Sequence, residues 1–227
     1  MRLTFVLLLL AGIVFACEAP VEFEQPQPVN QRDLNKIPKR LRGVYISTKD
    51  SSYLIIDGKK MISRMEVRFE GHKDSIDLDL DSIGLGINKK NIVMMEKDNA
   101  KFTFQLKGDL VFGTYLHSDT IFEISTRHKI RKFKGHYFLN YQHSIDNWKV
   151  NKLSLEKSLL TISKISFPKD LENLKEITEV EEVRSDKGKV MAYKLDPTRA
   201  ELKKLLDRNF KKINSYQKIG GASSVSE

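Results

Sequence analysis

Three aspartates at alternate positions, Asp77, Asp79 and Asp81, have the spacing closest to a metal site in this chain. Carboxylates at positions 1, 3 and 5 open a common calcium-binding loop, which also needs Gly at position 6 and Glu at position 12. This chain has Ser82 and Asn88 at those two positions. Because leucines alternate with the aspartates, the pattern favours a strand with one solvated acidic face. We therefore predict no metal site here.

Other residues that could carry catalysis lack the pattern that the chemistry needs. Gly84-Leu85-Gly86 misses the third glycine of a dinucleotide-binding loop, because Lys89 stands there. His128, His136 and His143 lie close in the sequence but have no metal-ligand spacing, and we expect them at the surface beside tyrosines. The chain also contains no Gly-x-Ser-x-Gly motif. These observations predict a protein that is not an enzyme and that carries no cofactor.

The densest basic segment of the chain, from Arg127 to Lys134, could contact an anionic ligand or surface. Phe133 lies among its charged residues and could serve as an apolar contact with lipid headgroups. Alternatively, the segment is an edge strand whose lysines prevent edge-to-edge pairing of sheets. The second interpretation is favoured, and the first stays open for five residues: Arg127, Lys129, Arg131, Lys132 and Lys134.

The N-terminus has the organisation of a secretory signal. Arg2 is followed by an apolar stretch from Leu3 to Ala16, which is too short to span a bilayer. Cys17 comes directly after this stretch and is the only cysteine of the chain, so no internal disulfide can form. The sequence therefore predicts export, with residues 1–16 as the signal peptide.

The four residues Val14-Phe15-Ala16-Cys17 resemble the lipobox of bacterial lipoproteins. The resemblance implies cleavage before Cys17 and transfer of acyl chains to this cysteine, and two or three such chains anchor a protein stably. The acidic residues Glu18, Glu22 and Glu24 follow, as in Bacteroidota-type lipoproteins that are exported to the cell surface. We expect a protein anchored in the bacterial outer membrane through Cys17, on its periplasmic or cell-surface face.

The charge of the chain is compatible with several partners. The formal net charge is +9, with 39 Lys and Arg against 30 Asp and Glu. Such a surface could attract anionic lipid or acidic glycan, but an excess of lysine also keeps proteins soluble. Nucleic acid is not expected as a partner of an exported lipoprotein.

The segment 17–38 is expected to be an extended tether. It contains four of the six prolines, interleaved with Glu, Gln and Asn. Segments of this composition bury little surface and stay extended. We therefore expect the tether to hold the body of the protein away from the lipid headgroups.

Residues 39–166 have the alternation of antiparallel strands. In the stretch from Arg64 to Glu70, apolar residues alternate with charged ones, which predicts a strand with one buried face. Strands are also expected at Phe102–Leu106, Leu110–His117 and Thr120–Ile124, with turns such as Asp57-Gly58 between strands. The expected fold is mainly β, an antiparallel meander that forms a barrel or a sandwich.

A short motif in this region resembles the start of the lipocalin fold. Gly43-Val44-Tyr45 is similar to the Gly-x-Trp at the start of the first lipocalin strand, with Tyr in place of Trp. The resemblance implies an internal cavity, for which the expected lining residues are Phe102, Phe104, Tyr115 and Phe122.

The C-terminal part, 167–213, is expected to add a β-hairpin and an amphipathic helix. The hairpin turns at Asp186-Lys187-Gly188, and Thr198 with Glu201 has the spacing of a capping box at the start of the helix. One apolar stripe would run through Leu202, Leu205, Leu206, Phe210 and Ile213. The tail 214–227 is expected to be disordered.

Together these patterns predict a membrane-anchored envelope lipoprotein with a non-catalytic interaction or scaffold role. The alternative is a lipocalin-like binder or carrier of an apolar or lipidic ligand. An internal apolar cavity would favour the binder, and a filled core with an exposed apolar patch would favour the scaffold.

Overall fold

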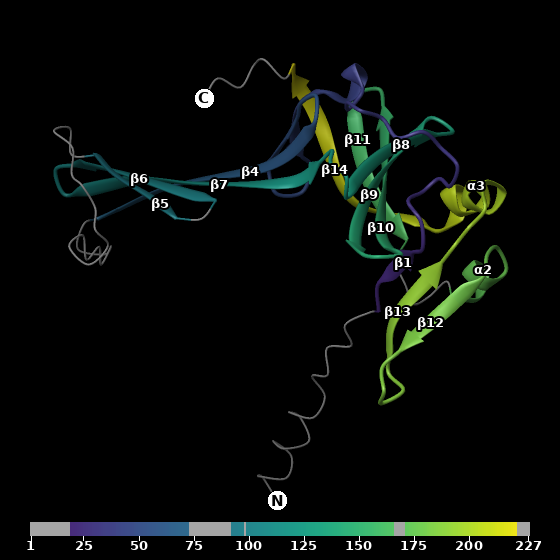
Figure 1. The fold of residues 1–227 in the computed structure, drawn as a ribbon. Helices are drawn as coiled ribbons and strands as arrows, with labels where there is room; N and C mark the ends of the chain where they lie inside the picture. The colour runs from purple at the N-terminus through teal and green to yellow at the C-terminus, as the bar shows by residue number, and fades with distance from the viewer. Residues whose placement is uncertain (1–18, 73–91, 98, 166–170, 222–227) are drawn as a thin grey trace, which may run out of the picture.

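The computed structural model describes residues 19–72, 92–97, 99–165 and 171–221 (Figure 1). Cys17, the three aspartates Asp77, Asp79 and Asp81, and Gly84-Leu85-Gly86 lie outside the described residues. The fold is mainly β, as the alternation predicts, and consists of one large mixed sheet that is not closed. Its strands are β1 (Val21–Phe23), β2 (Gly43–Ser47), β3 (Tyr53–Ile56), β4 (Lys60–His72), β5 (Ile92–Lys97), β6 (Ala100–Lys107), β7 (Leu110–Glu123), β8 (His128–Phe133), β9 (His136–Ser144), β10 (Asn147–Glu156), β11 (Leu159–Ile165), β12 (Val180–Arg184), β13 (Val190–Leu195) and β14 (Phe210–Gly220). The helical elements are the 3₁₀ turn η1 (Lys39–Leu41) and the helices α2 (Leu171–Lys175) and α3 (Arg199–Arg208).

Most of the sheet is an antiparallel meander that curls around one core. Its spatial order is β8-β9-β10-β11-β14-β2-β3-β4-β7, in which each neighbouring pair is antiparallel. The two ends of this path, β7 and β8, follow each other in the chain, but they are not paired with each other in the described ladder. The curl is therefore open along a seam between β7 and β8.

The curled sheet separates two apolar clusters. The inner cluster fills the curl and includes Tyr45, Met61, Phe122, Leu139 and Leu153, each at most 1 % exposed. The outer cluster lies on the other side of β9 and β10 and packs Phe138, Trp148 and Val150 against β1, α2 and α3. Residues of β10 alternate between the two clusters, as side chains of a strand do.

The segment expected as a tether is packed on the body from Ala19 onwards. Its strand β1 pairs in parallel with β13 and antiparallel with β10, and Phe23 is 1 % exposed. The N–H of Leu34 donates to Ile130 of β8, and that of Ile37 donates to Gly58 in the turn between β3 and β4. The prediction of an extended tether is thus wrong for the described residues, because their backbone groups find partners in the body.

Residues after β1 bridge the open seam of the sheet. Ile130 belongs to the strand on one side of the seam, and Gly58 belongs to the hairpin on the other side. Ile37 and Leu41 insert into the inner cluster and are completely buried. The segment between Leu34 and Leu41 therefore holds the two sides of the seam together.

Four strands extend away from this body as an arm (Figure 1). β4 and β7 pair along their whole length, and β6 and β5 continue the arm in the order β4-β7-β6-β5. Met65, Val67 and Phe69 of β4, expected on a buried face, are 37–44 % exposed because they lie on the arm. β7 is one continuous strand, so the expected break at Ser118-Asp119 is wrong: both residues pair with β4.

The hairpin and the start of the C-terminal helix agree with the sequence. β12 and β13 pair as expected, and Gly188 adopts a positive φ of 76° in the turn. The capping box of α3 is complete, since Thr198 and Glu201 each accept a hydrogen bond from the other's backbone N–H. Leu202, Leu205 and Leu206 form the buried face of the helix.

The end of the chain differs from the expectation. The helix ends at Arg208, and residues from Phe210 to Gly220 form β14, a central strand between β11 and β2. Phe210 and Ile213 therefore belong to a strand, and the described part of the tail, 214–221, is ordered in the sheet up to Gly220. The register shifts at Ile162/Ser163, so Ile213 is an extra residue that breaks the alternation of β14. This bulge hides the strand period in the sequence.

Candidate ligand-binding cleft

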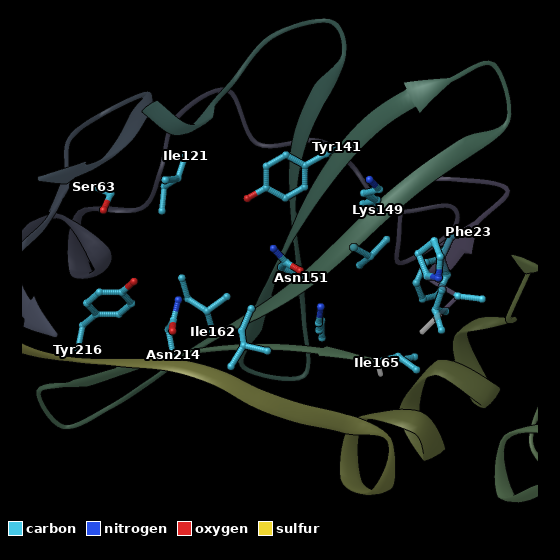
Figure 2. Close-up of a pocket in the computed structure, with 16 residues that line it drawn as sticks. Phe23, Ser63, Ile121, Tyr141, Lys149, Asn151, Ile162, Ile165, Asn214 and Tyr216 are labelled. Carbon is cyan, nitrogen blue, oxygen red and sulfur yellow. The ribbon is translucent and has the colours of Figure 1, made fainter. Parts of the chain in front are cut away.

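A cleft of about 670 Å³ opens at one end of the curled sheet (Figure 2). Its lining comes from β9, β10, β11 and β14, from Ser63 of β4 and Ile121 of β7, and from the start of the chain at β1. The volume lies within the range of about 300–1,000 Å³ that is typical of sites for small molecules. The cleft is therefore large enough for a ligand rather than only for water.

Apolar side chains line both ends of the cleft. Val21, Phe23 and Ile165 lie at one end, where the outer cluster reaches the cleft, and Ile121 lies at the other. Figure 2 shows Phe23 and Ile165 well separated from Ile121, with Asn151 and Ile162 between the two ends. Such a lining suits a ligand that is apolar over much of its length.

Two tyrosines add phenol groups to the wall. Burial raises the pKa of Tyr141 to about 12, and a hydrogen bond with the Asn151 side chain opposes this shift. Burial and then the negative charge of Asp50 raise the pKa of Tyr216, while a hydrogen bond with Asn214 opposes it. Both phenols are therefore neutral at physiological pH and can donate or accept hydrogen bonds.

The charges of the cleft have one sign. Lys149 and Lys164 line it, and none of the described residues in its lining is Asp or Glu. Glu22, the acidic residue in the middle of β1, is buried but does not line the cleft. The cleft therefore presents positive charge beside apolar surface.

The beginning of the described chain forms part of the cleft wall. Ala19 and Pro20 line the cleft, and Tyr193 of β13 donates its N–H to the carbonyl of Pro20. Ala19 is two residues from Cys17, a separation that spans at most about 7 Å of extended chain.

The cavity residues expected from the sequence do not form this cleft. Phe102, Phe104 and Tyr115 lie on the arm, where the ring of Phe102 contacts those of Phe104 and Tyr115, and the ring of Phe104 is edge-on to Phe69. Phe122 is in the inner core, with its ring edge-on to Tyr141 at 5.3 Å between centroids. None of these four residues lines the cleft, because the arm carries three of them away from the curl and Phe122 lies in the inner cluster.

Sequence reasoning also missed the residues that do line the cleft. Lys149, Asn151 and Leu153 alternate along β10, and the change from Lys to Leu along this face marks where the cleft meets the core. This alternation was a usable signal. The contributions of Ser63 and Ile121 could not be inferred, because they depend on how far the sheet curls.

The basic residues on and beside β8 differ in their contacts: two of them bind the N-terminal segment, and the others are exposed. Arg131 is only 12 % exposed in its side chain, donates from Nε to Asp33 at 2.6 Å, and also binds the carbonyls of Pro26 and Pro28. Lys129 lies 3.5 Å from the same carboxylate. The other basic residues of the segment, Arg127, Lys132 and Lys134, are exposed. Arg131 and Lys129 thus hold the N-terminal segment.

The three histidines do not converge on one site. His128 stacks on Phe122 and pairs across the strands with Tyr141, whereas His136 lies 2.8 Å from the hydroxyl of Ser154. His143 is exposed near the end of β9. Over residues 19–72, 92–97, 99–165 and 171–221, no group of three or more His, Cys, Asp or Glu could hold a metal ion.

The helices of the described chain give no transmembrane candidate, since none is both long and apolar enough to cross a bilayer. Comparisons with known protein families, with curated proteins and with solved structures find no match to this chain. The cleft and the sequence signal at Cys17 are therefore the features of the chain that bear on its function.

Proposed function

We propose that this protein is a lipid-anchored envelope lipoprotein that binds an apolar or lipidic ligand in the cleft of its curled sheet, without a catalytic step. The cleft is the observation that carries the proposal. A scaffold requires no such site, whereas this fold leaves about 670 Å³ open beside the inner cluster. The mixed lining of isoleucines, tyrosines and lysines suits a ligand with an apolar body.

The attachment at Cys17 supports a membrane source for the ligand. Because Ala19 and Pro20 are part of the cleft wall, acyl chains on Cys17 would bring this wall close to the outer membrane. A ligand could then pass between the bilayer and the cleft over a short distance. The anchor and the cleft thus serve one role in this proposal.

Two measurements test the proposal. Lipid extracted from the purified full-length protein and identified by mass spectrometry should include a stoichiometric apolar or lipidic compound. Cys17→Ala should abolish labelling with palmitate and release the protein from membranes. The binding role is contradicted if folded protein yields no ligand and binds none when lipids are added. The anchor is contradicted if the Cys17→Ala variant is still labelled with palmitate.

The arm supports a second candidate, an interaction or scaffold role with another envelope protein. Met65, Val67 and Phe69 share one face of β4 and expose 37–44 % of their surface. Exposed apolar residues grouped on one face are typical of protein contacts. Replacing Met65 and Val67 with Ser should then remove a specific cross-linked product in intact cells, while ligand binding in the cleft stays unchanged.

A further inference from the structure

The two lysines of the cleft are neighbours on paired strands. Asn151 of β10 lies directly opposite Lys164 of β11, so Lys149, two residues before Asn151, is the diagonal neighbour of Lys164. Diagonal neighbours on one face have Cβ atoms about 7–8 Å apart or slightly less. Two flexible lysine side chains at this separation can bring their ammonium groups to the same anion.

This arrangement is unfavourable without a counterion. Lys149 and Lys164 are close neighbours on paired strands, and like charges at such positions repel each other. Within the described part of the chain, Lys149 and Lys164 form no ion pair, whereas Lys129 and Lys194 each have a carboxylate partner. The lining of the cleft supplies no carboxylate that could neutralise the pair.

Apolar residues lie on the face of the sheet that carries the two lysines. Ile162, two residues before Lys164, shares the face of Lys164 and lines the cleft together with Ile121 and Tyr141. Lys149 and Lys164 are exposed, as expected for a headgroup site at the rim, while Ile162 is buried. Positive charge at the rim beside an apolar wall is the complement of an amphiphile with an anionic head.

We infer that the cleft binds an anionic amphiphile, with its carboxylate or phosphate headgroup between Lys149 and Lys164 and its hydrocarbon chain along the apolar wall. Asn151, which lies between the two lysines on the same face, is placed to donate its amide to the headgroup. The inference rests on the proposed function and specifies the ligand class of the same cleft.

The test uses the full chain with the substitution Cys17→Ala, so that no acyl group on the protein itself competes for the cleft. Binding of palmitate, hexadecyl phosphate and methyl palmitate is measured by displacement of a fluorescent fatty acid. Palmitate and hexadecyl phosphate should displace the probe at least about tenfold more effectively than the uncharged ester, since a bond to a charged group is worth roughly one order of magnitude or more. Whichever of palmitate and hexadecyl phosphate displaces the probe more effectively identifies the preferred headgroup.

The double variant Lys149→Met/Lys164→Met separates charge from apolar contact. It should weaken palmitate binding by about tenfold or more and leave binding of methyl palmitate unchanged. Lys132→Met/Lys134→Met removes the same charge from exposed positions on and beside β8 and should leave both affinities unchanged. All four lysines are exposed, and three of them, Lys132, Lys134 and Lys149, lie near strand ends or in a turn. Circular dichroism and thermal melting should therefore show folded variants.

The outcomes distinguish the inference from the proposed function. If the ester binds as tightly as palmitate, or if the double variant and the control weaken palmitate equally, the headgroup site is wrong although the cleft still binds lipid. If inorganic phosphate alone displaces the probe as well as hexadecyl phosphate does, the site takes a free anion and the amphiphile is wrong. If no compound binds to folded protein, the proposed function itself is wrong.

Discussion

The side chain of Asn140 binds both backbone groups of Gln27, a residue 113 positions earlier in the chain. Asn140 Oδ1 accepts from the N–H of Gln27 at 2.6 Å, and Asn140 Nδ2 donates to the carbonyl of Gln27 at 2.9 Å. Both residues are completely buried. The amide of Asn140 thus binds the backbone at Gln27 as a neighbouring strand would, and it holds the proline-rich part of the segment beyond the end of β1 on the body.

Asn140→Ala should lower the free energy of unfolding by about 1–3 kcal/mol, because it leaves buried backbone groups of Gln27 without partners. Urea unfolding followed by circular dichroism measures this change. Asn35→Ala, which removes an exposed amide from the same segment, should change stability by less than about 0.5 kcal/mol. Equal effects of the two substitutions would contradict the role of the Asn140 pair.

Arg131→Met should loosen the N-terminal segment while keeping the apolar stem of the side chain. The variant loses the bonds to Asp33 and to the carbonyls of Pro26 and Pro28. Each hydrogen bond to a charged group changes the equilibrium between the bound and the open segment by roughly one order of magnitude or more. Hydrogen exchange of amides from Gln27 to Leu34 should therefore accelerate by about tenfold or more.

The control for Arg131 is its exposed neighbour on β8. Lys132→Met removes the same charge and should leave exchange in this peptide unchanged. Mass spectrometry of the exchanged peptide compares the two variants. Unchanged exchange in Arg131→Met would show that Arg131 does not hold the segment.

Gly43→Ala should lower the free energy of unfolding by at least about 2 kcal/mol. Alanine rarely adopts the backbone conformation of Gly43, and its Cβ would collide with backbone of β14. Gly43 has a φ of +143°, and an added Cβ would lie 2.5 Å from the carbonyl oxygen of Gly220. Since that oxygen is backbone of β14, relief requires a shift in the pairing of β2 with β14. Gly58→Ala is the matched control, since its Cβ would meet no described atom closer than 3.9 Å. Similar melting temperatures of the two variants would contradict this packing.

The stability of the protein should fall as pH rises from about 10 to about 12. Burial raises the pKa of Tyr141 to about 12, whereas a tyrosine in the unfolded chain has a pKa of about 10. Between these values the unfolded state has lost a proton that the folded state keeps, so deprotonation favours unfolding. The contribution is fully present below pH 10 and is lost as pH approaches 12.

Tyr141→Phe should reduce this fall in stability, and Tyr45→Phe should reduce it as well, because burial also raises the pKa of Tyr45 to about 12. Urea midpoints measured at several alkaline pH values, together with the ultraviolet absorbance of tyrosinate, follow both effects. The assignment to Tyr141 fails if its removal leaves the pH dependence unchanged.

Local patterns predicted several elements correctly. The alternation in 39–166 predicted a mainly β fold, Gly188 marked the turn of the β12–β13 hairpin, and Thr198 with Glu201 marked the start of α3. Each of these features depends on residues close together in the chain. Strand alternation, a positive φ and a helix cap act over a few residues, so the sequence alone contains the needed information.

The errors concern features that depend on distant contacts. Phe210 and Ile213 fit a helical stripe, but β14 gains its partners from β11 and β2, and the bulge at Ile162/Ser163 removes the alternation that would have revealed a strand. The N-terminal segment has the composition of a tether, yet Asn140 and Arg131 hold it on the body. In both cases a partner far away in the sequence overrides the local preference.

The sequence by itself determined the strand-rich character of the body, the C-terminal hairpin, the helix cap and the prediction of an anchor at Cys17. Only the tertiary structure decided that the sheet curls without closing, that β14 completes it beside β2, and that Lys149, Lys164 and Tyr141 share one cleft. The physical reason is that periodicity specifies which face of a strand is buried, whereas the register and curl of the sheet specify what that face meets.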